Sequence, residues 1–499
     1  MSMNKTMGWL LAELQVPMPE GCDSEQTIHD LCLDSRAVQA GDVFMALSGF
    51  KVHGMDYAYQ AERAGAIAVL TEPVKADRAA QVGRQKPLGI PVIEVPDLSA
   101  QLGPLACAFY DHPSAHLQVI AVTGTNGKTS TAWLLMHALE QLGQKTGYLG
   151  TLGAGDMDQL QALPNTTPSA LAIQQQLAQM RQRGCQQVCV EVSSHALTQD
   201  RFSGTQVAAA LFTNLSRDHL DYHKTMKAYA AAKRKLFTDF APEVSIINAD
   251  DEVGLGWLQQ DLATANTRSY GLGQNGLDYQ ATDIHLEPAG LAFALQHGGQ
   301  SVQFTTELLG EFNVQNVLAV IATLHHQGHD LAALVPVVAA LQPVPGRMNR
   351  IDNPSNGSTL VVDYAHTPDA LEQVLKALRA HTQGQLWCVF GCGGNRDKGK
   401  RAMMGAIAEQ WADKVVLTDD NPRFESSAQI IADIEFGMKT KPHVISNRQQ
   451  AIAHAIDQSE AGDIVLLAGK GHESTQEING KLIPFNDMQV IKQLMQVAV

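Results

Sequence analysis

Long apolar runs are missing from this sequence: none reaches the roughly 18 residues that a membrane-crossing helix needs. Residues 1–20 contain no basic segment followed by a sustained apolar run, so we expect neither a signal peptide nor membrane insertion. Basic residues are also scarce, since 36 Lys and Arg stand against 51 Asp and Glu, for a formal net charge of −15. This excess of negative charge argues against nucleic acid or an anionic membrane as a partner, but not against nucleotides, which bind at local sites.

Cysteines are few, odd in number and scattered. Among the seven, none forms the C-x-x-C pair of a zinc ribbon. Most stand in apolar surroundings, such as Cys189 between two valines and Cys388 between Trp387 and Val389. We therefore predict buried free thiols in a reducing compartment and a cytoplasmic protein.

The chain is too long, at 499 residues, for one hydrophobic core. Strand-like apolar runs alternate with helical stretches along most of it, which favours α/β architecture with parallel sheets. We predict three domains: a small N-terminal α/β domain (1–97), a central mononucleotide-binding domain of the P-loop type with a parallel sheet (98–343), and a C-terminal Rossmann-like doubly wound domain (344–499). A helix over 98–112 and the Pro-Val-Pro-Gly-Arg segment 343–347 would provide the links.

A glycine loop between a strand and a helix is the strongest chemical signal. The apolar run 119–122 predicts a buried strand, Gly124 and Gly127 frame a turn, and an apolar helix follows Lys128 and Thr129. Such a loop lets backbone N–H groups approach a phosphate, while the lysine reaches the terminal phosphates and the threonine hydroxyl reaches Mg²⁺. Val122 stands where the usual motif has glycine, and a plain strand-to-helix turn is the alternative. The flanking elements favour ATP binding.

Two other motifs are weaker. Residues 271–276 have the spacing G-x-G-x-x-G, but strand-like residues follow them, so we predict a turn and no dinucleotide site. His219 and His223 have the spacing of zinc-protease ligands but lack the glutamate of that motif, so a zinc protease is not expected.

Charged side chains at predicted strand ends are further candidates for the nucleotide and metal site. Glu191 and His219 follow strands in the domain that holds Thr129, and the three could ligate Mg²⁺ around ATP phosphates. Lys233 is unexpected there, because a cation beside a metal would have to pair with a phosphate. The basic cluster 395–401 follows another strand, where it suits carboxylate or phosphate recognition.

Motifs along nearly the whole chain resemble those of the Mur ligases, the ATP-dependent amide-forming enzymes of peptidoglycan precursor synthesis. They stand in the family's order, at residues 123–129, 191–195, 214–221, 310–316, 345–348 and 363–366. Residues 34–36 and 391–399 look like those of the member that adds the third amino acid. The segment Asp420-Asn-Pro-Arg423 resembles the signature of members that add meso-2,6-diaminopimelate instead of L-lysine.

The resemblance implies an ADP-forming ligase that joins meso-2,6-diaminopimelate to UDP-N-acetylmuramoyl-L-alanyl-D-glutamate through an acyl phosphate. It would serve cell-wall biogenesis, cell shape and cell division, with ATP as co-substrate, Mg²⁺ as cofactor and small molecules as its partners. A monomer is expected. The alternatives are an L-lysine-adding member, a ligase like folylpolyglutamate synthase, and a non-catalytic ATP-binding switch protein.

The resemblance also implies a set of site residues. Catalysis would fall to Lys128, Lys233 and His219, and Mg²⁺ to Thr129, Glu191, His219 and Lys233, which the family carries as a carbamate. ATP would contact Thr123, Gly124, Thr125, Asn126, Gly127, Lys128, Thr129, Asn313, Arg347 and Asp363. The UDP-sugar and dipeptide would contact Leu33, Ser35, Phe50, Lys51, Val52, Asn165, Thr166, Thr167, Ser193, Gln199 and Arg201. Diaminopimelate would contact Arg396, Asp420, Asn421, Pro422, Arg423, Gly469 and Glu473.

Overall fold

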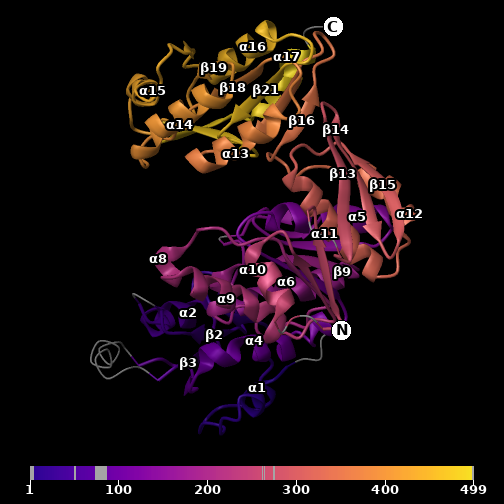
Figure 1. Ribbon diagram of the computed structural model, residues 1–499. Helices are drawn as coiled ribbons and strands as arrows, with labels where there is room; N and C mark the ends of the chain where they lie inside the picture. The colour runs from indigo at the N-terminus through magenta and orange to yellow at the C-terminus, as the bar shows by residue number, and fades with distance from the viewer. Residues whose placement is uncertain are drawn as a thin grey trace. The chain divides into compact units, whose positions relative to one another are not determined.

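The computed structural model describes residues 5–49, 52–73, 87–163, 165–260, 262, 264–273 and 276–496 (Figure 1). The chain packs as two compact units. The first unit comprises Met1–Ala132, Gly143–Ser245 and Asp261–Thr267, and the second comprises Trp133–Leu142, Ile246–Gln260 and Arg268–Val499. Each unit is described by itself below.

The first unit begins with a small parallel sheet of order β1-β2-β3-β4. Alternate residues of its strands enter two different cores: Val43 and Met45 pack on one face, Phe44 and Ala46 on the other. Burial on both faces is what parallel strands connected by helices require. The elements are α1 (Met7–Glu13), β1 (Leu31–Cys32), β2 (Val43–Ala46), η1 (Gly54–Tyr57), α2 (Ala58–Ala64), β3 (Ala68–Thr71), β4 (Val92–Glu94), α4 (Leu98–Phe109) and η2 (Pro113–Ala115).

A half-buried carboxylate, that of Asp30, connects this small sheet to the rest of the first unit. Asp30, just before β1, accepts a hydrogen bond from the Tyr110 hydroxyl at the end of α4. The Gln175 side chain of α6 (Ala170–Gln182) donates to the same carboxylate at 3.4 Å. Burial and the neighbouring Asp30 raise the pKa of Tyr110, so its hydroxyl stays a donor.

The rest of the first unit is built on strands in the order β8-β7-β6-β9-β5-β10. Strands β6, β9, β5 and β10 run parallel, while β7 and β8 turn back antiparallel at the edge. The parallel strands therefore end at one common edge of the sheet. The elements are β5 (Gln118–Thr123), β6 (Thr146–Gly150), β7 (Gly153–Asp156), β8 (Gln159–Gln161), β9 (Gln187–Glu191), α7 (Ser194–Thr198), β10 (Ala209–Phe212), α8 (Leu220–His223) and α9 (Met226–Thr238). Two more elements begin in the first unit and end in residues of the second: α5 (Lys128–Gln141) and β11 (Val244–Asn248).

An antiparallel meander opens the main part of the second unit. Strand β13 pairs with β14, and β14 pairs with β15 across the glycine turn at Gly298 and Gly299. A strand, not a helix, follows residues 271–276, which agrees with the turn predicted there; Gln274 and Asn275 lie outside the described residues. The elements are α10 (Glu252–Gln259), β12 (Thr267–Gly271), β13 (Tyr279–Glu287), β14 (Gly290–His297), β15 (Gln300–Thr306), α11 (Phe312–His326) and α12 (Leu331–Ala339).

The C-terminal part is a doubly wound sheet of order β16-β17-β21-β18-β19-β20, parallel except for β16, which confirms the predicted topology. Helices cover both faces, with α13 and α14 below the strands and α16 and α17 above them in Figure 1. The elements are β16 (Asn349–Asp352), β17 (Thr359–Asp363), α13 (Pro368–Arg379), β18 (Leu386–Phe390), α14 (Gly399–Trp411), β19 (Lys414–Leu417), α15 (Ser427–Glu435), β20 (His443–Val444), α16 (Arg448–Gln458), β21 (Ile464–Ala468), β22 (Thr475–Ile478), β23 (Lys481–Pro484) and α17 (Asp487–Gln496).

A wholly buried ion pair joins the last two long helices of this part. Arg448 at the start of α16 donates to the carboxylate of Asp487 at the start of α17, at 2.8 and 2.7 Å, and both side chains are fully buried. Arg448 also donates to the carbonyl oxygen of Ala468, at the end of β21, at 3.0 Å. Removing one partner of such a pair would leave the other charge buried and unpaired.

Within the part of the chain that the structure describes, helices fall short of the length and apolar character needed to cross a membrane. All seven cysteines are free. Five are buried, as predicted, while Cys22 and Cys32 are half-buried.

Candidate active site

The predicted phosphate loop connects β5 to α5 in the first unit, at the edge where the parallel strands end. Gly124 has φ +154° and Gly127 has φ +81°, values that side chains disfavour. A Cβ atom on Gly124 would also collide with the hydroxyl of Thr213. The loop therefore needs glycine for both its path and its close approach to a neighbouring strand.

The end of β10 holds the loop in shape. Asn214 accepts from the backbone N–H of Thr125 at 2.8 Å through its carbonyl and from the N–H of Asn126 at 2.9 Å through its side chain. The Thr213 hydroxyl donates to the carbonyl oxygen of Asn126 at 2.6 Å. Asn214 belongs to a motif that we singled out, but its role as a support of the loop did not follow from the sequence.

Lys128 folds back over this loop. Its amine donates to the carbonyl oxygens of Gly124 and Thr125 at 2.9 and 2.8 Å. A lysine anchored on the loop places its positive charge where the loop's N–H groups can also meet an anion.

Glu191, at the end of β9, is fully buried and surrounded by donors. The Thr129 hydroxyl donates to Oε2 at 2.8 Å, and the backbone N–H of Thr151 donates to Oε1 at 2.8 Å. The hydroxyls of Thr151 and Tyr148 donate to Oε2 and Oε1 respectively. The structure thus brings Glu191 against Thr129, as expected, and adds Tyr148 and Thr151, which sequence reasoning missed.

Lys233 lies on α9 with its side chain almost fully buried. Its amine donates to the carbonyl oxygen of Gly124 at 2.6 Å and lies 4.6 Å from the ring centre of Tyr229. Burial, and secondarily the charge of Lys128, hold the pKa of Lys233 well below its ordinary value. Burial thus favours the neutral form of this amine, which is a nucleophile as well as a hydrogen-bond donor.

Histidines line the neighbouring segment. His219 has a left-handed backbone, with φ +53°, and its half-exposed ring lies 4.9 Å from the ring of His195. Burial, followed by the charges of His219 and Arg201, lowers the pKa of His195. His223 bonds the Ser194 hydroxyl at 2.9 Å, and its ring also lies near that of His195, at 5.4 Å.

Predicted dipeptide contacts form a connected chain that starts at Glu191. The Thr167 hydroxyl donates to the carbonyl oxygen of Glu191 at 2.9 Å and accepts from the N–H of Ser193 at 3.0 Å. Arg201 donates to the Thr167 carbonyl at 3.3 Å and to the Gln199 side chain. Thr166 bonds the Thr151 hydroxyl at 3.2 Å. The structure therefore gathers these residues around the buried carboxylate, with Asn165 exposed beside them.

The predicted UDP-sugar contacts are less closely assembled. Ser35 is buried and donates to Gln60 at 3.1 Å, Leu33 is half-buried, and Val52 is exposed. Phe50 and Lys51 lie outside the described residues.

The donor set near the loop fits a hard cation held partly by a ligand. Among the described residues, groups of three or more His, Cys, Asp or Glu side chains arranged to hold a metal are absent. A hydroxyl from Thr129 and a carboxylate from Glu191 stand side by side at 2.8 Å. Mg²⁺ commonly takes one or two protein ligands and completes its shell with phosphates and water. The residues present therefore suit a magnesium ion that arrives with a nucleotide.

In the second unit, the predicted nucleotide contacts occupy two places. Asn313 on α11 is buried, donates to the Leu309 carbonyl at 2.8 Å and accepts from Asn316 at 2.8 Å. Asp363, at the end of β17, accepts from the N–H groups of Met348 and Ala365 at 2.8 and 2.7 Å. Burial raises the pKa of Asp363, while these bonds act in the opposite direction. Arg347 is exposed beside it.

The predicted diaminopimelate contacts meet where β19 and β21 end. Asn421 donates to Glu473 at 3.0 Å and accepts from Lys470 at 3.2 Å, and Lys470 donates to Glu473 at 2.9 Å. Burial raises the pKa of Asp420, and its Oδ1 atom receives no hydrogen bond from the described residues. A Cβ on Gly469 would lie 3.5 Å from Asp420 Oδ2, so these two residues adjoin. The buried Lys470 was not predicted.

Arg423 is held in place by two partners. Its Nε donates to Glu477 at 3.0 Å and its Nη1 to the carbonyl oxygen of Gly394 at 2.9 Å. Glu477 lies on β22 and was not predicted. Arg396 is exposed, whereas the fully buried Arg401 of the same basic cluster pairs with Glu425 and Asp433, so it supports the loop from within.

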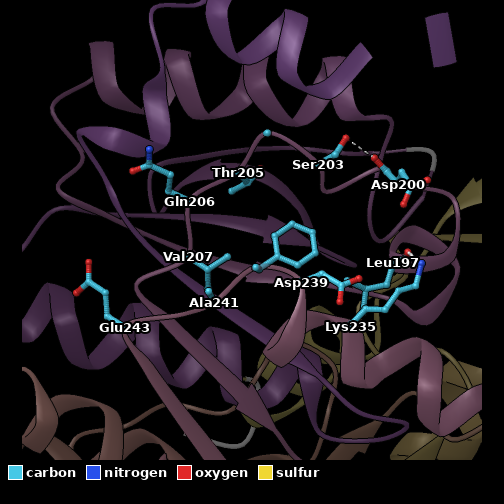
Figure 2. Close-up of a pocket in the computed structure, with 12 residues that line it drawn as sticks. Leu197, Asp200, Ser203, Thr205, Gln206, Val207, Lys235, Asp239, Ala241 and Glu243 are labelled. Carbon is cyan, nitrogen blue, oxygen red and sulfur yellow. Dashed lines mark hydrogen bonds between the residues drawn. The ribbon is translucent and has the colours of Figure 1, made fainter. Parts of the chain in front are cut away.

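A cavity of about 550 Å³ lies elsewhere in the first unit (Figure 2). Its walls come mainly from the segments that lead into β10 and β11, at the amino ends of those strands, and they include Asp200, Lys235, Asp239, Phe240 and Glu243. Open parallel sheets bind ligands at the carboxyl ends of their strands. The candidate active site is therefore the phosphate loop and not this cavity.

Comparisons with known proteins agree with this geometry. Three family models match: "Mur ligase family, catalytic domain" at residues 27–110, "Mur ligase middle domain" at 122–324 and "Mur ligase, glutamate ligase domain" at 346–471. Relatives named UDP-N-acetylmuramoyl-L-alanyl-D-glutamate--2,6-diaminopimelate ligase include one from Haemophilus influenzae, 42% identical over 93% of this chain and 95% of its own length. Another, from Xylella fastidiosa, is 44% identical over 97% of both chains.

A solved structure with the same name is 36% identical, with a TM-score of 0.74 over 100% of this chain and 99% of that one. A MurF ligase from Thermotoga maritima in complex with ADP shares the fold, with a TM-score of 0.60 at 18% identity. The predicted family and its three-domain α/β architecture are confirmed: the chain belongs to the Mur ligase family.

Proposed function

We propose that this protein is the ligase that adds meso-2,6-diaminopimelate to UDP-N-acetylmuramoyl-L-alanyl-D-glutamate with conversion of ATP to ADP. The observation that carries the proposal is the phosphate loop with Thr129 bonded to Glu191 at 2.8 Å and Lys233 bonded to Gly124 at 2.6 Å. The names of relatives 42–45% identical to the chain support the choice of substrates.

The reaction needs positioning more than covalent chemistry from the protein. An oxygen of the D-glutamyl carboxylate attacks the γ-phosphorus of ATP, ADP leaves, and an acyl phosphate forms. The amine of diaminopimelate then attacks the acyl carbon, loses a proton, and expels phosphate. Lys128 and the N–H groups of the loop would stabilise the charge on the transferring phosphoryl group.

A magnesium ion would neutralise charge between the phosphates. Thr129, Glu191 and His219 would hold it, together with Lys233 after this amine adds to CO₂ and releases a proton to become a carbamate. The lowered pKa of Lys233 supports that step, because only the neutral amine carries a free electron pair. The change also replaces a cation with an anion beside the metal, which removes the difficulty raised by the sequence.

Roles of the other predicted residues follow their places in the two units. Thr123 to Thr129, with Asn313, Arg347 and Asp363, would bind ATP. Thr166, Thr167, Ser193, Gln199, Arg201 and Asn165 would bind the muramoyl dipeptide, and Leu33, Ser35 and the 50–52 segment the uridine part. Asp420, whose buried Oδ1 lies 3.8 Å from the Lys470 amine but receives no hydrogen bond from the described residues, would accept one from an ammonium group of diaminopimelate. Arg396, Asn421 to Arg423, Gly469 and Glu473 would surround the same ligand.

We further propose domain boundaries at 97 and 343, a monomeric state and a cytoplasmic location. The start of α4 at Leu98 and the proline-rich segment after α12 support the boundaries. The free cysteines and the formal net charge of −15 support a cytoplasmic protein that works on small molecules.

A mixed reaction tests the proposal. Purified protein would be incubated with the UDP-muramoyl dipeptide, ATP, Mg²⁺ and either meso-diaminopimelate or L-lysine, and the products would be weighed by mass spectrometry. We expect the diaminopimelate adduct and ADP, with Lys128→Ala as a control that forms neither. ADP without an amide product would indicate a switch protein, and equal use of lysine would indicate the lysine-adding member.

A further inference from the structure

We propose that Tyr148 is a positioning residue that fixes the Glu191 carboxylate for the magnesium–nucleotide complex. The inference rests on the proposed function, because it takes Mg²⁺ bound to ATP or ADP as the ligand. Tyr148 lies on β6, is fully buried, and donates its hydroxyl hydrogen bond to Glu191 Oε1.

The two oxygens of Glu191 have different kinds of donors. Oε1 is held by a backbone N–H, from Thr151 at 2.8 Å, and by the phenol of Tyr148, which is fixed by packing in the core. Oε2 is approached by the hydroxyls of Thr129 at 2.8 Å and Thr151 at 3.2 Å. Hydroxyl hydrogens rotate, so these two groups can turn their lone pairs toward an arriving cation. One oxygen is thus anchored, and the other faces the loop ready for metal.

Gly150 provides the space for this anchor. A Cβ atom there would collide with both Glu191 Oε1 and the Tyr148 hydroxyl. The side chains of residues 148 and 191 therefore meet in the volume that a side chain at 150 would occupy. Tyr148 thus supplies the hydrogen-bond donor, and Gly150 leaves room for it.

An anchored carboxylate binds a cation without first losing rotational freedom. Partners that orient a metal ligand from behind commonly contribute about 10- to 100-fold to metal affinity. Tyr148→Phe removes the hydroxyl and keeps the ring in the core, so it tests the hydrogen bond alone.

A matched control exists in the same unit. Tyr110 also donates its hydroxyl to a carboxylate, that of Asp30, on the sheet of β1 to β4. Tyr110→Phe therefore deletes the same kind of bond at a place outside the loop.

The experiment measures ADP binding by isothermal titration calorimetry over a series of Mg²⁺ concentrations, with thermal unfolding recorded for each variant. We expect Tyr148→Phe to need about tenfold more Mg²⁺ for the same ADP affinity, while its affinity for ADP without metal stays at the wild-type level. Tyr110→Phe should keep the wild-type Mg²⁺ dependence. Gly150→Ala, which displaces the anchored oxygen from the other side, should shift the dependence in the same direction as Tyr148→Phe.

The inference would be overturned if wild type, Tyr148→Phe and Gly150→Ala showed the same Mg²⁺ dependence of ADP binding. Tyr148 would then have a purely structural role, whether or not its variant lost thermal stability. That outcome leaves the proposed function standing if the wild type forms the amide product. A wild type whose ADP binding ignores Mg²⁺ would instead contradict the proposed magnesium site, and the positioning role with it.

Discussion

The amine of Lys233 and the carbonyl oxygen of Gly124 lie 2.6 Å apart, although 109 positions separate the two residues in sequence. The contact ties α9 to the first glycine of the phosphate loop. It also keeps the amine out of water, where its pKa falls far below the ordinary value of 10.5. The lowered pKa favours the neutral form of the amine, which is the form that can add to CO₂.

The first prediction is therefore that Lys233 carries a carbamate in protein kept in bicarbonate. Native mass spectrometry should detect the added mass of one CO₂, and removal of CO₂ should lower activity reversibly. Lys233→Arg, which keeps a cation and cannot form the carbamate, should lose activity by about 100-fold or more if a metal ligand is lost. Full activity of that variant in CO₂-free buffer would refute the modification.

The second prediction concerns stability and pH. In CO₂-free buffer the unfolded chain protonates Lys233 up to pH 10.5, whereas the folded chain keeps it neutral above a much lower pKa. Between those two values the unfolded state binds more protons, so the free energy of unfolding rises with pH. Lys233→Met removes this slope. In this variant the carbonyl oxygen of Gly124 still accepts a hydrogen bond from the Lys128 amine.

We therefore expect Lys233→Met to stabilise the first unit by about 1–3 kcal/mol at neutral pH, with the gain shrinking as the pH approaches 10. Chemical denaturation across this pH range checks both the sign and the trend. A gain that grows with pH would contradict the neutral amine.

The third prediction separates chemistry from amino-acid binding. Lys128→Ala should lower the rate of ADP formation by about 100-fold or more, because it removes a donor to the transferring phosphoryl group. Diaminopimelate binding should change little, since its predicted contacts lie in the second unit. Steady-state kinetics and calorimetry with diaminopimelate distinguish the two effects. Normal turnover in this variant would contradict a role for the phosphate loop in the reaction.

The fourth prediction concerns specificity. Diaminopimelate and lysine differ by a carboxylate at the far end, and the planar guanidinium of Arg423 suits that group. Arg423→Ala should raise the KM for diaminopimelate by about tenfold or more and reduce its advantage over lysine. Arg423→Lys keeps the charge but loses the fork, so it should restore only part of the preference. An unchanged ratio of kcat/KM values for the two amino acids in both variants would count against Arg423.

Much of this architecture could be predicted because its signals are local. The strand, glycines and lysine of the phosphate loop stand next to one another, and the alternation of apolar runs indicates the parallel sheets. Strands β6, β7 and β8 were not predicted, since glycines and polar residues interrupt the apolar pattern at 146–161. Tyr148 and Thr151 lie in that region, so their contact with Glu191 could not be anticipated.

Partners that meet only through the fold were missed for the same reason. Glu477 contacts Arg423 from a hairpin 54 positions away. Arg401 and Arg396 stand in the same basic cluster, but Arg401 is buried and Arg396 is exposed. Charged residues are usually solvated, so sequence gives no sign of which one the core encloses.

The buried pair of Arg448 and Asp487 bears on the order in which the nascent chain can fold. Until translation passes Asp487, a guanidinium destined for the interior lacks its carboxylate, and the strand end at Ala468 lacks the support that this arginine gives it. The neighbouring segments around Gly469 and Asp420 should settle only when α17 has left the ribosome. In a nascent chain, the segments that carry the predicted diaminopimelate contacts should therefore stay unsupported until α17 is available to pair with Arg448.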